Sequence, residues 1–323
     1  MKANRALFGL KTNLNLMKMP IKLLLKIYDT MVVPILLYGA EVWAASCKFT
    51  PDQWDKTEIE KQHASLLKQI LGLNRSTPNI AVRAEFGRLP LIINSHVRVW
   101  NYIKYLRKKT DSCVKKAYKI DSDIDIKNAH FKEIELGIKK LIAQNIKKSQ
   151  DPYTASQKRV KLFLKNDYVE FWKDKIRNSP TSASYATHKN EYKMEAYLIH
   201  VRIKKHRNSL AKLRLSDHQL HIHTGRQTRP KTPQNLRTCK KCPEHVEDEA
   251  HFLLQCKEDS DIKNDLVNRI AMDFPKVSDI TDKNILYKFV MKIQTPDILK
   301  SLGFCVNLLF KNRENRKKEK KSP

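Results

Sequence analysis

Glycine is scarce in this sequence: seven of its 323 residues are glycine, against about 7% in an average soluble protein. Sandwiches, barrels and the glycine-rich loops of nucleotide-binding folds depend on such residues for tight turns and close backbone approach. Apolar residues recur instead at intervals of three and four, as in Leu66, Leu67, Ile70 and Leu71, which is typical of an amphipathic helix. The sequence therefore predicts a mainly α-helical protein.

Several helix boundaries can be predicted from local signals. Pro34 should end or kink a helix that begins near Ile21. Thr50, Pro51 and Gln53 match a capping box, with a capping hydroxyl, a proline at the first helical position and Gln at the third. That signal predicts a helix which continues as far as Gly72. Apolar periodicity predicts further helices over residues 94–109, 160–172 and 197–215, with a polar loop over 178–190.

The chain is strongly basic. It has 63 Lys and Arg residues against 34 Asp and Glu residues, a formal net charge of +29, and a pI near 9.8. Such an excess favours a polyanionic partner, with RNA or DNA first and an anionic membrane second. The longest apolar stretch, residues 31–40, contains Pro34 and is much shorter than the roughly 20 residues of a membrane span. We therefore expect no membrane partner.

No apolar core of a signal peptide is apparent near the amino terminus, because Lys2, Arg5, Lys11 and Lys18 interrupt it. We expect an intracellular protein, in a nuclear or cytoplasmic ribonucleoprotein. In a reducing compartment, clustered cysteines bind metal more often than they form disulfides.

Three of the six cysteines cluster with a histidine in the spacing C-x2-C-x8-H-x4-C: Cys239, Cys242, His251 and Cys256. Three thiolates and one imidazole are typical ligands of structural zinc, and a C-x-x-C turn supplies two of them from one tight loop. With four protein ligands no position remains for a catalytic water, so the Zn²⁺ would be structural. His245 is a competing ligand, but its spacing from Cys242 would strain the chelate. Cys47, Cys113 and Cys305 are isolated and are interpreted as small apolar residues.

The segment before this cluster, residues 200–229, contains eight Lys or Arg residues and a single acidic one, Asp217. Cations at this density favour contacts with phosphates, although a basic helix can also be a solvated surface. Because the segment adjoins the cysteine cluster, we interpret its cations as candidate nucleic-acid contacts: Arg202, Lys204, Lys205, Arg207, Lys212, Arg214, Arg226 and Arg229. The basic end of the chain, residues 311–323, is predicted to be a disordered tail that serves as a localisation signal or an electrostatic arm.

Catalytic motifs are missing from the sequence. It has no Walker A motif, no G-x-S-x-G, no H-E-x-x-H and no adjacent pair of aspartates. Two-metal phosphoryl transfer needs carboxylates on both sides of the ions. We therefore expect no enzymatic activity from this chain alone.

Three stretches resemble the part that follows the polymerase core in LINE-type non-LTR retrotransposon reverse transcriptases. They are PILLYGAEVW at 34–43, NIAVRAEFGRLPL at 79–91, and the run from LRLSDH at 213–218 through TGR at 224–226 to the CCHC cluster. The first resembles the thumb of these enzymes, and the last resembles their carboxy-terminal basic helix and CCHC zinc knuckle. The catalytic palm, with its Tyr/Phe-x-Asp-Asp motif, and the endonuclease domain are missing from this sequence.

The resemblance implies five segments. These are a thumb-like helical domain over 1–109, a helical connector over 110–195, the basic helix with the zinc knuckle over 196–260, carboxy-terminal helices over 261–310 and the tail over 311–323. It also implies that the chain holds template RNA or target DNA during target-primed reverse transcription, with the upstream reverse transcriptase core as a further partner. The alternatives are a zinc-ordered protein-interaction scaffold and an enzyme completed in trans by a separate palm.

A chain that has lost its palm should expose the helix face that packs against it. We therefore expect an exposed apolar patch formed by Leu7, Leu10, Leu24, Tyr28 and Val32. If that face is fully buried within the chain, the hypothesis that the chain has lost its palm is weakened.

Overall fold

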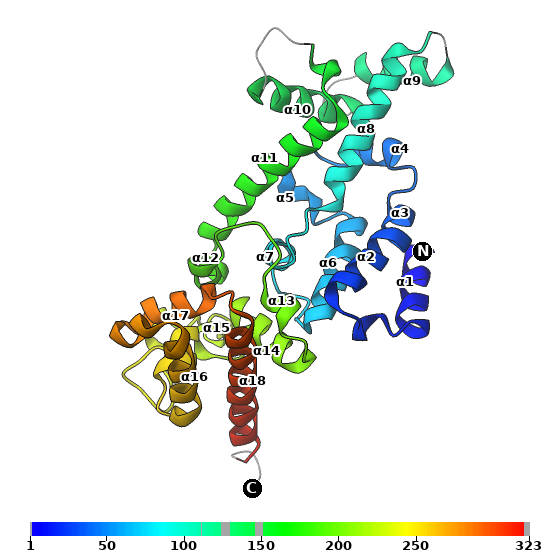
Figure 1. Ribbon diagram of the computed structural model, residues 1–323. Helices are drawn as coiled ribbons and strands as arrows, with labels where there is room; N and C mark the ends of the chain where they lie inside the picture. Colours follow the sequence, from blue (N-terminus) through cyan, green and yellow to red (C-terminus); the bar gives the residue numbers. More distant parts are fainter. Residues whose placement is uncertain (1, 111, 124–129, 146–150, 320–323) are drawn as a thin grey trace. The chain divides into compact units, whose positions relative to one another are not determined.

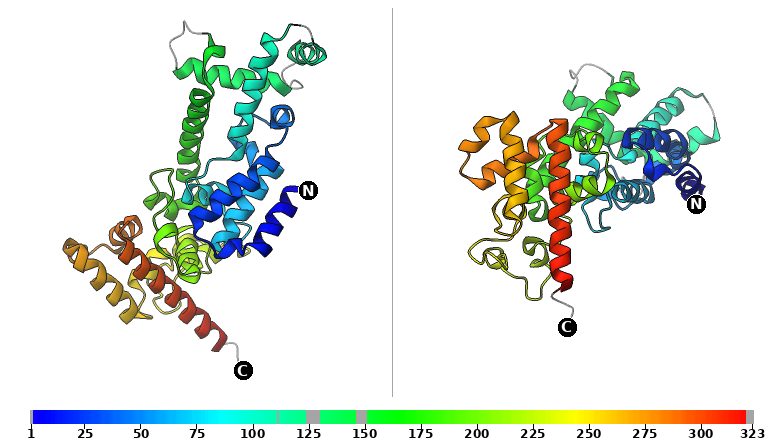
Figure 2. Two further views of the ribbon diagram at one scale, coloured as in Figure 1. Left: turned by 45° about the vertical axis from the view of Figure 1, so that its right-hand side comes forward. Right: turned by 60° about the horizontal axis from the view of Figure 1, so that its bottom comes forward.

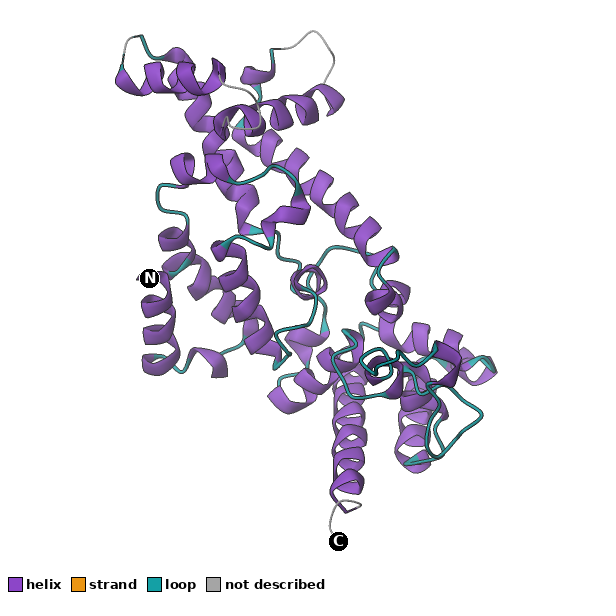
Figure 3. Ribbon diagram, turned by 180° about the vertical axis from the view of Figure 1, so that it is seen from behind, coloured by secondary structure: helices purple, strands orange, loops and turns teal. Residues whose placement is uncertain are grey.

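A computed structural model describes residues 2–110, 112–123, 130–145 and 151–319. Across these residues the chain forms helices joined by loops (Figure 3), with two isolated β-bridges and no β-strand. The predicted mainly α-helical fold is therefore confirmed. Parts of the predicted connector and the last four residues of the predicted tail lie outside the described residues.

The chain divides into two compact units, residues 1–66 with 88–174 and residues 67–87 with 175–323. These boundaries differ from those of the five predicted segments, because residues 67–87 group with the carboxy-terminal half. Two helices begin in the first unit and end in the second, α6 (Glu58–Leu71) and α11 (Gln157–Arg177). The other helices of the first unit, coloured blue to green in Figure 1, are α1 (Lys2–Asn13), η1 (Leu16–Lys18), α2 (Ile21–Met31), α3 (Val33–Leu36), α4 (Ala40–Trp43), η2 (Ala44–Ser46), α5 (Pro51–Trp54), α8 (Leu91–Lys108), α9 (Cys113–Asp123), α10 (His130–Asn145) and η3 (Pro152–Thr154).

The predicted breaks in the first unit have different outcomes. The chain bends at Val32, between α2 and α3, with Pro34 in the first turn of the second helix, as predicted. The capping box is wrong: the Thr50 side chain makes no capping hydrogen bond, and α5 ends after one turn at Trp54. The following helix, α6, does end at Leu71, next to Gly72, whose φ of +61° favours glycine.

Aromatic rings fill the centre of the first unit. Trp54 lies between His96 and Tyr168, with ring centroids 5.6 and 5.8 Å away, and all three side chains are buried. Phe49 also stacks on His96, with ring centroids 5.5 Å apart. This Trp54 cluster joins α5, α8 and α11, so it holds together segments more than 100 residues apart in the chain.

The predicted exposed face of α1 and α2 is mostly buried. Leu24, Tyr28 and Val32 are at most 1% exposed, and Leu7 and Leu10 are half-buried. The reason is that the Tyr28 ring stacks on His63 of α6 within the same unit. The predicted exposed patch is therefore wrong for Leu24, Tyr28 and Val32. Other apolar side chains of α1 to α4 and of the loop between α3 and α4 are exposed: Phe8, Leu23, Met31, Ile35, Tyr38 and Val42.

The second unit, coloured mostly light green to red, contains shorter helices around one long one (Figures 1 and 2). Its elements are α7 (Asn79–Glu85), η4 (Pro180–Ser182), α12 (Ala183–His188), α13 (Tyr197–His200), α14 (Lys204–Arg214), α15 (His221–Thr224), η5 (Gln234–Leu236), η6 (His251–Gln255), α16 (Ser260–Asp273), η7 (Pro275–Asp279), α17 (Lys283–Lys292) and α18 (Pro296–Glu319). The long helix α18 lies beside both α14 and α16.

Two further predictions from the sequence are wrong here. The polar stretch 178–190 is largely helical, as η4 and α12, because Tyr185 and His188 are buried and the Tyr185 hydroxyl donates to Ala81 O. The basic tail is not disordered over 311–319, where α18 continues to Glu319. Arg313 and Arg316 hold this end of α18 in place by pairing with Glu247 and Asp259.

In the part of the chain that the structure describes, no single helix is long and apolar enough to cross a membrane. The bent pair formed by residues 21–36 and 40–46 has the necessary length and composition only when its two arms are taken together.

Candidate functional site

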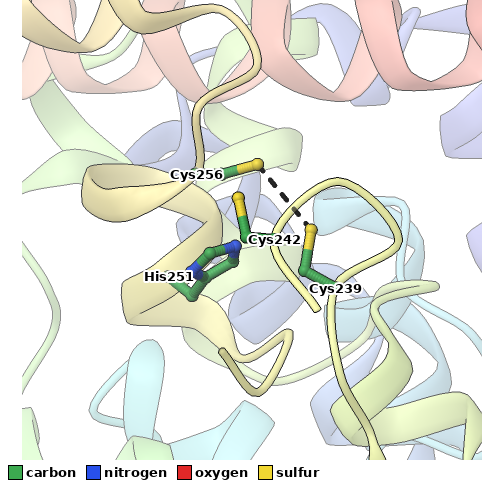
Figure 4. Close-up of side chains that lie close together, drawn as sticks. All are labelled: Cys239, Cys242, His251 and Cys256. Atoms are coloured by element: carbon green, nitrogen blue, oxygen red, sulfur yellow. Dashed lines mark hydrogen bonds between the residues drawn. The ribbon is translucent and has the colours of Figure 1, made fainter. Parts of the chain in front are cut away.

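The four predicted metal ligands meet in the second unit (Figure 4). The chain forms a tight turn at the C-x-x-C sequence, in which the Cys239 amide donates to His245 O and the His245 amide donates to Cys242 O, both at 2.9 Å. His251 is the first residue of η6, where its amide donates to the carboxylate of Asp248 at 2.8 Å. Cys256 follows η6 directly, so turn and helix together bring four ligands from 18 residues of chain to one point.

The distances suit a tetrahedral metal site. One ligand atom from each of the four side chains lies within 4.8 Å of the others, and all four residues are buried. The Sγ atoms of Cys239 and Cys256 are 3.8 Å apart. Four ligands at about 2.3 Å from a central ion would be about 3.8 Å apart. This buried group could therefore hold a metal ion.

The surroundings of His251 support the same conclusion. Both of its ring nitrogens are buried and lack a hydrogen-bond partner among the described residues, which is costly for a polar group unless a ligand satisfies it. Phe252, Leu253 and Leu254 are buried next to it in η6. His245, the competing ligand, is exposed and lies outside the cluster.

Burial also affects the thiols. It raises the pKa of Cys256 to about 12, so the metal-free thiol keeps its proton at neutral pH and a metal ion must displace it. The ammonium of Lys263 donates to Cys256 O at 2.7 Å and to Glu258 O, and this side chain is buried. A cation at this place favours the thiolate form.

Hydrogen bonds connect the metal cluster to the end of α14. Glu249 accepts from the Ser216 hydroxyl at 2.6 Å and lies 3.0 Å from His218 Nε2. Glu247 accepts from the His221 amide at 2.7 Å. The cluster is therefore held against the segment that carries the predicted basic residues.

The predicted cations differ in exposure. Lys204 and Lys205 are exposed at the start of α14, and Arg202 is exposed just before it. Arg229 is exposed in the loop after α15. Lys212 is half-buried, as is Arg226, which donates to Pro180 O at 2.9 Å. These six side chains remain candidates for phosphate contacts.

Arg207 and Arg214 are buried and have to be removed from that set. The guanidinium of Arg207 donates to Val201 O, and that of Arg214 donates to Glu85 and to Met291 O. Both lie on the same side of α14 as Leu210, at intervals of three and four residues. They stabilise the fold and cannot reach a phosphate.

Arg214 is the centre of a buried ion network with Glu85, Glu195 and Lys189. Its Nε is 3.1 Å from Glu85 Oε2 and its Nη2 is 3.0 Å from Glu195 Oε2, while Lys189 pairs with Glu195. Burial alone would raise the pKa of Glu85, but the charges of Arg214 and Lys189 outweigh it and the pKa is lowered. Two cations and two carboxylates compensate one another in this Arg214 network.

A close backbone approach brings the two carboxylates together. The Glu195 amide donates to Glu85 O at 2.9 Å, beside the bridge between Phe86 and Met194. Gly87 has a φ of +60°, and a Cβ there would lie 2.5 Å from the Met194 amide nitrogen. Only glycine fits both requirements without a shift of the backbone.

The sequence interpretation missed the cations of α18. Lys311, Arg313, Arg316 and Lys317 were assigned to a disordered tail, yet they are ordered on this helix beside the metal cluster. The available signal was the periodicity itself, because Arg313 and Arg316 continue the spacing of Leu302, Val306 and Leu309.

Comparisons with known proteins give no further guide: no family model, no curated protein and no solved structure matches this chain.

Proposed function

We propose that this chain binds RNA or DNA as the carboxy-terminal part of a non-LTR retrotransposon reverse transcriptase, holding template RNA or target DNA without carrying out chemistry itself. The observation that carries the proposal is a buried Cys3His group that is held by a hydrogen bond to the segment following a cation-rich helix, α14. The sequence resemblance around these same residues supports the assignment to this family.

The metal in this proposal is zinc. Cys239, Cys242, His251 and Cys256 would supply three thiolates and one imidazole, a donor set that selects zinc over the harder divalent ions. The ion would fold the module rather than activate water, since the protein fills all four positions. Metal analysis of protein purified without chelator should find about one zinc per chain, and a content near zero would contradict this part of the proposal.

Nucleic-acid binding is tested by its dependence on salt. Each cation on a phosphate releases counterions, so the binding constant should fall steeply as salt rises. Titrations of a structured RNA and of a DNA duplex should show this slope, and the triple substitution of Arg202, Lys204 and Lys205 by Gln should reduce it. Binding that does not respond to salt would contradict the proposal.

A second candidate, a protein-interaction scaffold, is favoured by a different observation. The first unit has an apolar cavity of about 850 Å³, lined among others by Pro34, Ile35, Tyr38 and Trp43. Tyr38 is 85% exposed beside it and Val42 is 58% exposed, which is typical of a surface that binds another protein. In the proposed family the partner would be the upstream reverse transcriptase core. Salt-insensitive capture of that core, without nucleic-acid binding, would favour this second function.

A further inference from the structure

The basic residues of α14 line a cavity together with those of α18. Its volume is about 630 Å³, and its cationic lining includes Lys205 and Lys212 from α14 and Lys311 and Lys317 from α18. We call this the lysine groove. Its two helices lie side by side because Gly303 of α18 approaches Val201 and His206 closely, and because Asn307 donates to the Ser209 hydroxyl.

The cations of α18 have two distinct roles. Arg313 and Arg316 form ion pairs with Glu247 and with Asp259, at 2.9 and 2.8 Å, which fix the helix next to the metal cluster. In the described part of the chain none of the four groove lysines forms an ion pair, and the pKa of Lys317 is lowered, first by burial and then by the charge of Arg313. The arginines therefore anchor the helix, whereas the lysines carry positive charge that no direct ion pair neutralises among the described residues.

Acidic residues near the groove are mostly engaged elsewhere. Asp217 accepts from the amide and the side chain of Asn74, and Glu247 pairs with Arg313. Glu314 is exposed in the lining. Four lysines face this single exposed carboxylate, so the groove is suited to an anion with several charges.

The remaining lining is suited to unpaired bases. Asn208, Gln219 and Asn307 place amide groups between the lysines. The side-chain oxygen Oδ1 of Asn208 is buried and has no hydrogen-bond partner among the described residues, so it is an acceptor without a donor. Phe310 also lines the groove, and its ring is fixed by stacking on Phe252 at 4.9 Å.

The groove continues toward the metal cluster. A second cavity, of about 280 Å³, shares Gln219, Arg313 and Lys317 with the first and is lined further along by Cys239 and Lys240. Duplex DNA is usually bound by a protruding element that enters its wide groove. A concave, cationic path with amides and an aromatic ring is typical of sites for single strands.

We propose that a single-stranded segment of nucleic acid binds in the lysine groove, with its phosphates on Lys205, Lys212, Lys311 and Lys317 and its path leading toward the Cys3His cluster. This inference rests on the proposed nucleic-acid-binding function and names the ligand and its site.

The test uses the full chain and two matched variants. In the groove variant, Lys205, Lys212, Lys311 and Lys317 are replaced by Gln, which keeps the helix propensity. In the control variant, Lys276, Lys283, Lys288 and Lys292 of the same unit, which lie outside the lysine groove, are replaced by Gln. Both variants lose four charges, so a difference between them reports position and not net charge. Metal content and thermal unfolding verify that each variant is folded.

Binding is measured with single-stranded RNA, single-stranded DNA and a duplex of the same sequence across a range of salt concentrations. For single strands each phosphate contact contributes about 0.7 to the slope of log K against log salt, so loss of four contacts should reduce the slope by about 2.8. The control variant should keep the slope of the unmodified chain. If the groove substitutions weaken the binding of single-stranded RNA alone, RNA is the ligand. If they weaken the binding of single-stranded RNA and single-stranded DNA equally, the site recognises the phosphates that both share.

Three results would count against the inference in different ways. Equal slopes for the groove and control variants, while the unmodified chain still binds, would overturn the groove and leave the proposed function standing. Tighter binding to the duplex than to either single strand would overturn the single-strand assignment. A chain that binds no nucleic acid would overturn the proposed function and this inference together.

Discussion

The centres of the two units are built from different chemistry. The Trp54 cluster of the first unit packs aromatic rings against one another, with a histidine as its polar member. The second unit instead buries the Arg214 network and a Cys3His group. An aromatic core loses stability gradually as atoms are removed, whereas a buried charge or an empty ligand group is costly as soon as its partner is missing. The second unit should therefore depend on specific partners more strongly than the first, which buries an ion pair of its own between Glu60 and His63.

Metal removal should separate the two units most clearly. Structural zinc sites contribute about 10 to 16 kcal/mol of apparent binding free energy, so a chelator or Cys242→Ser should abolish amide exchange protection across residues 236–258. Protection at the end of α18 should fall too, because Arg313 and Arg316 are held by Glu247 and Asp259. Hydrogen exchange measured by mass spectrometry reports both regions, and α8 of the first unit serves as the internal reference.

Cys113→Ser is the matched control for that experiment, since Cys113 is exposed and outside the cluster. It should leave exchange unchanged throughout the chain. Equal effects of the two substitutions, or equal loosening of α8, would contradict the distinction between the units.

Arg214→Met should have the next largest effect. The variant leaves two buried carboxylates, of Glu85 and Glu195, without their common partner, which typically costs about 3 to 5 kcal/mol. Arg202→Met makes the same chemical change at an exposed position of the same segment and should stay within about 0.5 kcal/mol. Urea unfolding of both variants measures the difference, and similar costs would show that the network is not a specific feature of the second unit.

In the first unit, folding stability should depend on pH through His96. Burial lowers the pKa of this histidine from 6.5 to about 4. The pKa of His96 is lower in the folded state than in the unfolded chain. The contribution of neutral His96 to folding stability is therefore complete above pH 6.5 and is lost as pH falls toward 4. The loss should amount to about 3 kcal/mol at the end of that range.

His96→Phe tests whether protonation of His96 causes this loss of stability. A phenyl ring placed between Phe49 and Trp54 cannot take up a proton. The variant can be less stable at every pH through overpacking, so only the slope of unfolding free energy against pH is decisive. Between pH 6.5 and 4, exchange protection in α8 should fall less in the variant than in the unmodified chain. An unchanged slope would assign the pH dependence to another group.

The features that sequence predicts well are local. The metal cluster was found from spacing because a tight turn and a short helix bring its four ligands together within 18 residues, and helical periodicity located α8 and α11 within a few residues of their bounds. Arg214 could not be interpreted in the same way, because its partner Glu85 is 129 residues away. Its position on the face of Leu210 was visible in the sequence, but a basic residue on an apolar stripe gives no sign of its counterion.

The helical structure of residues 311–319 could not be predicted for the same reason. It depends on ion pairs with Glu247 and Asp259, which are distant in the chain.

The smallest expected effect concerns helix capping, where local sequence was a poor guide in the first unit. Thr50→Ala should change stability by less than about 0.5 kcal/mol, because the Thr50 hydroxyl makes no capping bond. Asp282→Ala in the second unit should cost about 1 kcal/mol, since the Asp282 carboxylate accepts from the amides of Asn284 and Ile285 at 2.7 and 3.3 Å. Thermal unfolding of the two variants side by side measures this. A cost at Thr50 equal to that at Asp282 would mean that the capping box forms in solution and that the first unit, too, depends on a specific polar partner.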